Sequence, residues 1–345
     1  MMVSDNSDLS LQNLIVKALL KPEVYNEKVK KVKLIQTYHS FVFLAGDFAY
    51  KIKKAVKFPY FDFSTLDKRK EDLEKELRLN KRLASDLYLG IVPITMEDEE
   101  IKICGKGRII EYALKMKRIP ERYLMSKLLE ENKVGNEAIE NIAKIIADFH
   151  SKAESNEEIS KYGSIEVIKY NWNENFEQTR EFINITISEN QFNFIKKIID
   201  DFIYKNKSLF EKRMKEGMIK DCHGDLYSES IFITPNKIYI FDCLEFIDRF
   251  RFSDTVSEVA FLAMDLDFHD RSDLSDLFIE KYIEFSKDVE LLKLLQFYKC
   301  YRAYVRGKVE SFKLKDPNIG KRDKNIAVKN ARKYFNLSFN YAKQL

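Results

Sequence analysis

Two aspartates on either side of a short β-hairpin constrain this chain more than any other feature of its sequence. Asp225 stands in the segment His223-Gly224-Asp225-Leu226, and Asp242 follows 17 residues later. Between them, β-type runs at 231–233 and 237–241 are separated by a Pro-Asn pair, which predicts a hairpin turn. Two carboxylates beside paired strands suit phosphoryl transfer, where one orients a hydroxyl and the other binds Mg²⁺. A lone His-Gly-Asp would indicate only a loop with a capping Asp.

Length and composition bound the architecture and exclude some classes of function. With 345 residues, the chain is too long for one small core and suits two lobes or two domains. A hydrophobic fraction of 45% and a charged fraction of 33% are compatible with a packed core. Lys and Arg total 59 against 55 acidic residues, so the net charge of +4 gives no reason to expect nucleic-acid binding.

The start of the chain and its cysteines favour a cytoplasmic protein. The first residues are polar and show no basic segment followed by an apolar run, so no secretory signal is expected. No apolar run approaches the roughly 18 residues of a membrane span, and we expect none. The four cysteines form no Cys-x-x-Cys pair, which favours a reduced, intracellular protein.

The spacing of apolar residues changes from strand-like to helical along the chain. Runs at 32–35, 41–44 and 48–52 predict an antiparallel meander, and 108–116 predicts a further strand. His150 falls on an apolar helical face and is interpreted as a hydrogen-bonded core histidine. Helices are expected over residues 9–20, 67–85, 139–150, 191–204, 205–215, 254–265, 272–286 and 290–312.

The segment around Asp225, with Asp242 after a hairpin, resembles the catalytic segment of the aminoglycoside phosphotransferase family, kin of choline kinases and protein kinases. The resemblance extends to a subgroup of uncharacterised kinase-like phosphotransferases and covers about residues 30 to 315. The further motifs that carry it are Tyr50-Lys51-Ile52-Lys53-Lys54, Phe61-Asp62-Phe63-Ser64-Thr65-Leu66, Glu76-Leu77-Arg78-Leu79-Asn80, Asp86-Leu87-Tyr88-Leu89-Gly90, Phe241-Asp242-Cys243-Leu244-Glu245-Phe246 and Tyr301-Arg302-Ala303-Tyr304-Val305-Arg306-Gly307-Lys308.

The resemblance implies an α+β, bilobal, protein-kinase-like fold. A small antiparallel-sheet lobe for the nucleotide is expected over residues 1–118, and a mostly helical catalytic and substrate lobe over residues 119–345. The implied activity is transfer of the γ-phosphate of ATP, with Mg²⁺, to a hydroxyl of an unidentified small molecule. An aminoglycoside substrate is not implied, because such polycations need an acidic cleft and the C-terminal region is basic.

Several residues of the first lobe match the ATP-binding positions of the resembled family. Lys51 and Lys53 point to the same face of a strand, and the family pattern favours Lys51 as the lysine on the α- and β-phosphates. Glu76 matches the helical glutamate that pairs with that lysine. The first hairpin turn contains no glycine, so Ser40 or backbone amides would contact phosphate. Met116 lies just before the passage to the helical lobe, where the adenine edge is expected to bond backbone.

The resemblance also assigns roles around the two aspartates. Asp225 would orient the acceptor hydroxyl and accept its proton, His223 would brace the loop, and Asp242 would bind Mg²⁺. Ser230 stands where the family usually has an asparagine that holds the second metal ion, and a serine hydroxyl is a weaker ligand. Ser230 is therefore expected to weaken the phosphotransferase activity. A regulatory, catalytically impaired pseudokinase and a protein kinase both stay open as alternatives.

Three residues are candidates for binding the acceptor substrate. Arg302 and Arg306 stand four apart on a predicted helix and suit an anion clamp, or they bond the acidic segment 242–267 in a structural role. Trp172, the single tryptophan of the chain, lies in a segment that would line the substrate cleft or pack between helices.

Overall fold

The computed structural model describes residues 2–3, 6–58, 61–317 and 319–345, and it divides into two compact units. The first unit comprises Met1–Leu124 and Phe232–Asp248, and the second comprises Met125–Ile231 and Arg249–Leu345. The segment Phe232–Asp248, which was expected in the helical lobe, is thus grouped with the sheet-containing unit.

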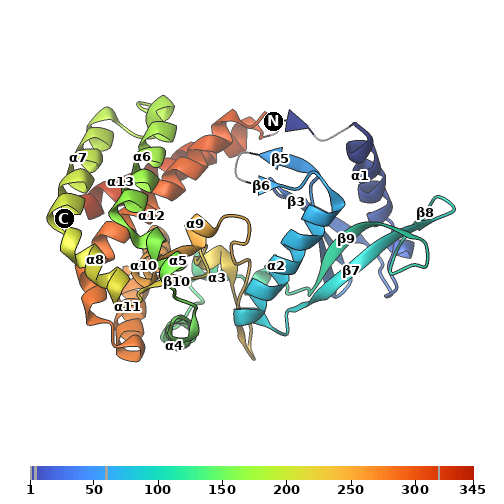
Figure 1. Cartoon of the computed structure of the whole chain (residues 1–345), viewed down its shortest axis with the longest axis horizontal. Coiled ribbons are helices and arrows are strands. Elements are labelled where there is room, and N and C mark those ends of the chain that lie inside the picture. Colours follow the sequence, from blue (N-terminus) through green and yellow to red (C-terminus); the bar gives the residue numbers. More distant parts are fainter. Residues whose placement is uncertain (1, 4–5, 59–60, 318) are drawn as a thin grey trace. The chain divides into compact units, whose positions relative to one another are not determined.

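A six-stranded antiparallel sheet forms the centre of the first unit (Figure 1). The meander predicted near its start is confirmed, and Gly46, at a φ of +59°, supplies the left-handed turn between the second and third strands. The strands follow the order β2-β3-β4-β9-β7-β8 in space. Their bounds are β2 Val32–Gln36, β3 Ser40–Ala45, β4 Phe48–Lys53, β7 Tyr88–Glu97, β8 Glu100–Ile103 and β9 Arg108–Lys117.

Two helices of the first unit, α1 (Asn6–Leu19) and α2 (Leu66–Ala84), pack on the sheet. Alternate residues of β4 point to opposite faces, so Tyr50 packs with α1 while Lys51 faces α2. The remaining strands of this unit are short: β1 Met2–Val3, β5 Val56–Phe58 and β6 Phe61–Asp62, with β12 Ile238–Ile240 paired to β11 Ile231–Ile233.

Helices make up most of the second unit, as the sequence predicted. Apart from 3-10 turns, they are α3 Met125–Glu130, α4 Asn136–Lys152, α5 Glu157–Ser160, α6 Ile165–Thr179, α7 Glu189–Lys205, α8 Lys207–Lys215, α10 Thr255–Phe268, α11 Ser272–Ser286, α12 Leu292–Phe312 and α13 Lys321–Ala342, with α9 Asp248–Arg251 at the boundary. Among the described residues, no helix has both the length and the hydropathy that a membrane crossing requires.

The middle of the second unit is built around α10. This helix is buried along almost its whole length and packs against α11 and α12, which explains its nearly continuous apolar sequence. Strand β13 (Phe252–Asp254) leads into it and pairs with β10 (Ile219–Asp221). In this antiparallel pairing Asp254, which precedes α10, lies opposite Ile219, and Glu258 of α10 binds the chain that follows β10 and carries Asp225. The predicted α+β class is confirmed.

Candidate functional site

A buried lysine of the first unit lies between two carboxylates. Lys51 on β4 is 6% exposed, and its Nζ lies 2.7 Å from Oε1 of Glu76 on α2 and 3.2 Å from Oδ1 of Asp242. Asp242 follows β12 with a φ of +61°, and its backbone amide donates to the Tyr88 hydroxyl. Its side chain is 57% exposed, so this carboxylate is accessible to solvent. The structure therefore brings together three residues that the sequence singled out for nucleotide and metal.

A second ammonium group lies beside the first. Lys53 is fully buried on β4, with its Nζ 2.7 Å from Asp72 Oδ2 and 2.8 Å from Glu76 Oε2, and it also pairs with Glu245 Oε1. Glu76 thus binds one lysine with each of its oxygens. The three carboxylates around Lys53 converge closely enough to hold a metal ion, but the ammonium group already binds all three.

Four carboxylates share two ammonium groups here. Burial and ion pairing shift the pKa values of Glu76 and Glu245 in opposite directions. Burial raises the pKa of Glu76, but Lys51 and Lys53 outweigh it and lower that pKa to about 2. Burial raises the pKa of Glu245 to about 7, despite the attraction of Lys53. Burial alone would lower the pKa of Lys51, yet Asp242 and Glu76 raise it well above the ordinary value. Lys51 therefore carries a positive charge at neutral pH.

The raised pKa of Glu245 predicts a pH-dependent contribution to stability. A carboxyl group whose pKa rises on folding contributes stability that is complete below its unfolded pKa of 4.5 and is lost as the pH rises through about 7. The amide introduced by Glu245→Gln does not titrate. We therefore expect the unfolding free energy of Glu245→Gln, measured relative to that of the wild type, to increase by roughly 2–3 kcal/mol as the pH rises from 4.5 to 7.5. Urea unfolding across this range measures the gain, and a constant difference would contradict it.

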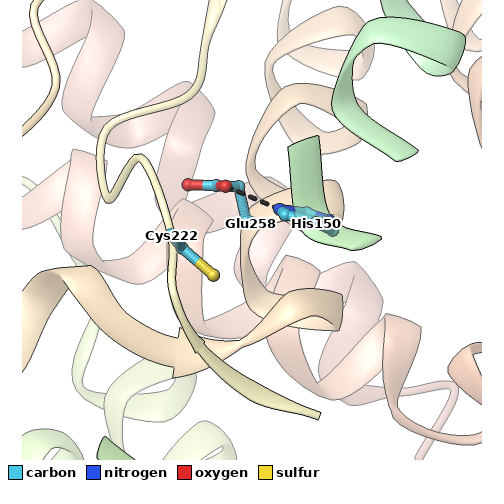
Figure 2. Close-up of side chains that lie close together, drawn as sticks. All are labelled: His150, Cys222 and Glu258. Atoms are coloured by element: carbon cyan, nitrogen blue, oxygen red, sulfur yellow. Dashed lines mark hydrogen bonds and ion pairs between the residues drawn. The ribbon is translucent and has the colours of Figure 1, made fainter. Parts of the chain in front are cut away.

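In the second unit, a buried carboxylate holds the loop that follows β10. Glu258 on α10 accepts hydrogen bonds from the backbone amides of His223 (3.0 Å) and Gly224 (2.7 Å), one with each oxygen. The oxygen that binds His223 also lies 2.7 Å from His150 Nε2, and Figure 2 shows this contact. The other ring nitrogen of His150 lies 2.7 Å from the Tyr282 hydroxyl. His150 is therefore a buried, hydrogen-bonded histidine, as the sequence indicated.

The same region contains a second group with metal-ligand geometry. His150, Cys222 and Glu258 each place one potential ligand atom within 4.8 Å of the others (Figure 2). However, both His150 nitrogens and both Glu258 oxygens already make hydrogen bonds, and burial raises the pKa of the Cys222 thiol well above its usual value. This group is better described as support for the loop than as a metal site.

The loop itself presents Asp225 from a left-handed backbone turn. Gly224 has a φ of +88°, a conformation that favours glycine. The backbone amide of Asp225 donates to Nδ1 of His223 at 3.3 Å, and His223 is fully buried. This contact agrees with a loop-supporting position for His223. The Asp225 residue is partly exposed, and its catalytic role stays a prediction.

Ser230 makes two hydrogen bonds within the turn that precedes β11. Its hydroxyl donates to the Tyr227 carbonyl at 2.9 Å and accepts from the Tyr227 amide at 3.1 Å. The residue is 2% exposed. A hydroxyl with these two partners is a poorer candidate for a metal than a free one, and the predicted ligation by Ser230 stays a prediction.

Two further candidates for nucleotide binding lie on the sheet of the first unit. Ser40 begins β3 opposite Lys53, and its hydroxyl is buried without a hydrogen-bond partner among the described residues. Met116 lies on β9 between Ala49 and Tyr88 of the neighbouring strands and packs on the apolar cluster under α2. Both positions are compatible with the predicted roles but do not test them.

The three substrate candidates lie in different surroundings. Arg302 on α12 and Trp172 on α6 line one cavity, and Trp172 stacks on Phe176 at 5.3 Å. Arg306 does not line that cavity, and its guanidinium lies over the Tyr227 ring. The structure therefore brings Arg302 and Trp172 together and leaves Arg306 out.

Neither Glu245 nor Glu258 is among the predicted site residues, and Lys53 is the less favoured of the two strand lysines. Glu258 carried a detectable signal, because it is the one acidic residue of the mostly apolar run 256–264 and a buried acid must find a partner. Glu245 carried no such sequence signal beyond its place in a motif.

No family model matches the sequence. Uncharacterised proteins of Mycobacterium tuberculosis and Mycobacterium bovis are 34% identical over 275 residues, which is 80% of this chain and 54% of theirs. The chain thus spans about half the length of these curated relatives.

Solved structures with the same fold come from small-molecule kinases. A choline kinase of Cryptosporidium parvum aligns over 97% of this chain and 94% of its own, with a TM-score of 0.54 and 15% identity. A choline/ethanolamine kinase family protein of Mesorhizobium loti aligns over 97% of this chain and 100% of its own, with a TM-score of 0.52 and 10% identity. A proposed aminoglycoside phosphotransferase of Ralstonia eutropha aligns over 96% of this chain and 98% of its own, with a TM-score of 0.51 and 11% identity. The kinase-like phosphotransferase fold predicted from the motifs is confirmed.

Proposed function

We propose that the chain, which has the fold of choline kinases and aminoglycoside phosphotransferases, transfers the γ-phosphate of ATP to a hydroxyl of a small molecule, with Mg²⁺ as cofactor. The observation that carries the proposal is the buried pairing of Lys51 with Glu76, beside the exposed carboxylate of Asp242. A charged ammonium next to an accessible carboxylate suits a polyphosphate and its divalent cation. The small-molecule kinases among the structural neighbours support the acceptor class.

The first unit offers groups that fit a nucleotide and its metal ion. Lys51 stays protonated at neutral pH, because Asp242 and Glu76 outweigh the effect of burial on its pKa. Asp242 would hold Mg²⁺ through its exposed carboxylate, and the Ser40 hydroxyl, unpartnered among the described residues, is available to a phosphate oxygen. Met116 would contact the base. When bound, Mg²⁺ supplies positive charge that offsets the charge of the phosphate oxygens.

The second unit offers the group that would act on the acceptor. Asp225 would orient the acceptor hydroxyl and take its proton while the hydroxyl oxygen bonds to the γ-phosphorus. The bond from that phosphorus to the bridging oxygen breaks, and ADP leaves with the electron pair. His223 and Glu258 would hold the loop during this step, since both bind its backbone.

One observation favours a second candidate, an impaired nucleotide-binding pseudokinase. The Ser230 hydroxyl already has two partners in Tyr227, so a second metal ion would lack the usual ligand at this position. Gain of turnover in Ser230→Asn would identify the serine as the cause of weak activity. Tight ATP binding without Mg²⁺ dependence, and without that gain, would favour the pseudokinase.

The proposal is tested by incubating the full chain with γ-labelled ATP, Mg²⁺ and fractionated pools of small metabolites. We expect label in a small molecule whose mass increases by about 80 Da, the mass of a phosphoryl group. Label on a protein would identify a protein kinase, and addition of AMP would identify nucleotide transfer. Absence of any turnover by the wild type would reject the proposal.

Asp242→Asn tests the metal assignment. We expect this variant to lose at least about 100-fold in transfer rate, because a neutral amide binds Mg²⁺ less well than a carboxylate. Raising the Mg²⁺ concentration should restore part of the rate, which steady-state assays can measure. Asp248→Asn, which changes a carboxylate of the same segment paired with Lys75, is the matched control. Equal losses in both variants would contradict the assignment.

A further inference from the structure

The second unit contains a cavity beside the loop that carries Asp225. It is lined by residues of α6, β13, the start of α10 and α12, with a volume of about 50 Å³. Arg302 connects the two places, because it lines the cavity and its Nη1 donates to the Gly224 carbonyl at 3.4 Å. A cavity of this size accommodates a polar group of a few heavy atoms, since one water needs roughly 10–15 Å³ on this measure.

The charge of Arg302 is held by neutral groups of this unit. The residue is 6% exposed, and its Nε donates to the carbonyl and the hydroxyl of Ser257, which are neutral acceptors. Among the residues that the structure describes, no carboxylate forms an ion pair with it. The other arginines nearby are neutralised: Arg213 by Asp254 and Asp288, Arg249 by Glu174, and Arg251 by Asp221. A buried guanidinium without a carboxylate is costly, so an external anion would stabilise this arrangement.

A second observation concerns the same cavity. The hydroxyl of Ser253 on β13 is buried and has no hydrogen-bond partner among the described residues, although it lines the cavity. A hydroxyl is a suitable donor to a bound oxyanion. The acid that also lines the cavity, Asp254, is unavailable to Arg302, because Arg213 binds both of its oxygens at 2.6 and 2.8 Å.

The rest of the lining is aromatic. Trp172, Phe250, Phe252 and Tyr301 contribute rings, and the guanidinium of Arg302 lies 5.8 Å from the Tyr301 ring centre. Such walls favour an apolar or planar part of a ligand and strengthen the interaction of an oxyanion with Arg302 by excluding water.

We propose that this cavity binds an oxyanion group, a carboxylate or a phosphate ester, of the acceptor, so that the substrate is an anionic hydroxyl compound. The inference rests on the proposed phosphotransferase function. The anion would be held by Arg302 and Ser253, while the hydroxyl of the same molecule attacks the γ-phosphorus of ATP and releases ADP. Cationic amino alcohols carry no oxyanion that could pair with Arg302.

The experiment compares acceptors that differ in charge, using the full chain with ATP and Mg²⁺. Hydroxy acids and sugar phosphates form the two anionic arms, and matched neutral and amino alcohols form the others. We expect kcat/KM for an anionic acceptor to exceed that of its neutral analogue by about 100-fold. Arg302→Gln should remove this preference, Arg302→Lys should keep part of it, and the exposed Arg332→Gln should not change it. Preference for amino alcohols, or a preference unchanged in Arg302→Gln, would overturn the inference and leave the proposed function intact.

A binding measurement separates this inference from the proposed function. Inorganic phosphate and acetate should raise the melting temperature of the wild type and of Arg332→Gln, but not that of folded Arg302→Gln, as checked by circular dichroism. This result would support the anion site even if no acceptor were phosphorylated. An equal shift in all three proteins, or no shift in any, would overturn it.

Discussion

Asp225→Asn is expected to lower kcat for phosphoryl transfer by about 10³-fold, within the range for loss of a general base. The asparagine side chain has nearly the same size but cannot accept a proton from the acceptor hydroxyl. Glu258 and His223 bind backbone amides of the loop, so the substitution leaves these contacts in place. Nucleotide affinity should therefore change by less than about twofold. Steady-state kinetics together with calorimetric titration of ATP measure both quantities.

Glu229→Gln is the matched control for that variant. Glu229 is an exposed carboxylate four residues further along the same loop, and its change should leave kcat within about twofold. Retention of full turnover in Asp225→Asn would remove Asp225 from the mechanism. A loss accompanied by weaker ATP binding would instead indicate a disturbed loop.

Lys53→Met is expected to destabilise the protein by about 3–5 kcal/mol at pH 8, the usual cost of leaving buried charges unpaired. Lys53 is fully buried and forms ion pairs with Asp72, Glu76 and Glu245. Without it, these carboxylates must take up protons in the folded protein. Burial already raises the pKa values of Asp72 and Glu245. The destabilisation should therefore shrink as the pH falls from 8 to 5, which urea unfolding at both pH values measures.

A lysine of the same unit provides the comparison. Lys57 has a 58% exposed side chain and a single ion pair among the described residues, with Asp62 at 3.4 Å, so Lys57→Met should change stability by less than about 0.5 kcal/mol. In the double variant Lys53→Met with Glu245→Gln, part of the lost stability should return, because one buried acid is removed. A Lys53→Met penalty that does not depend on pH would argue against unpaired carboxylates as its cause.

Much of the fold was predictable because its signals are local. The meander, the hairpin between the two aspartates and most long helices follow from repeats of two or 3.6 residues, which the chain carries in short windows. The repeat of two residues along a strand was enough to predict that Lys51 and Lys53 lie on one face. The choice of Glu76 among the acids of α2 came from a family resemblance, since several of them satisfy the same periodicity.

The sequence by itself determined the alternation of elements, the side of each strand or helix that is apolar, and the motifs that mark a kinase-like phosphotransferase. Only the tertiary structure decided which charged and polar groups meet. Glu245 reaches Lys53 across 192 positions, and Arg302 reaches Gly224 across 78. The physical reason is that Coulomb interactions and desolvation depend on distance and burial in space, whereas a sequence pattern records only separation along the chain.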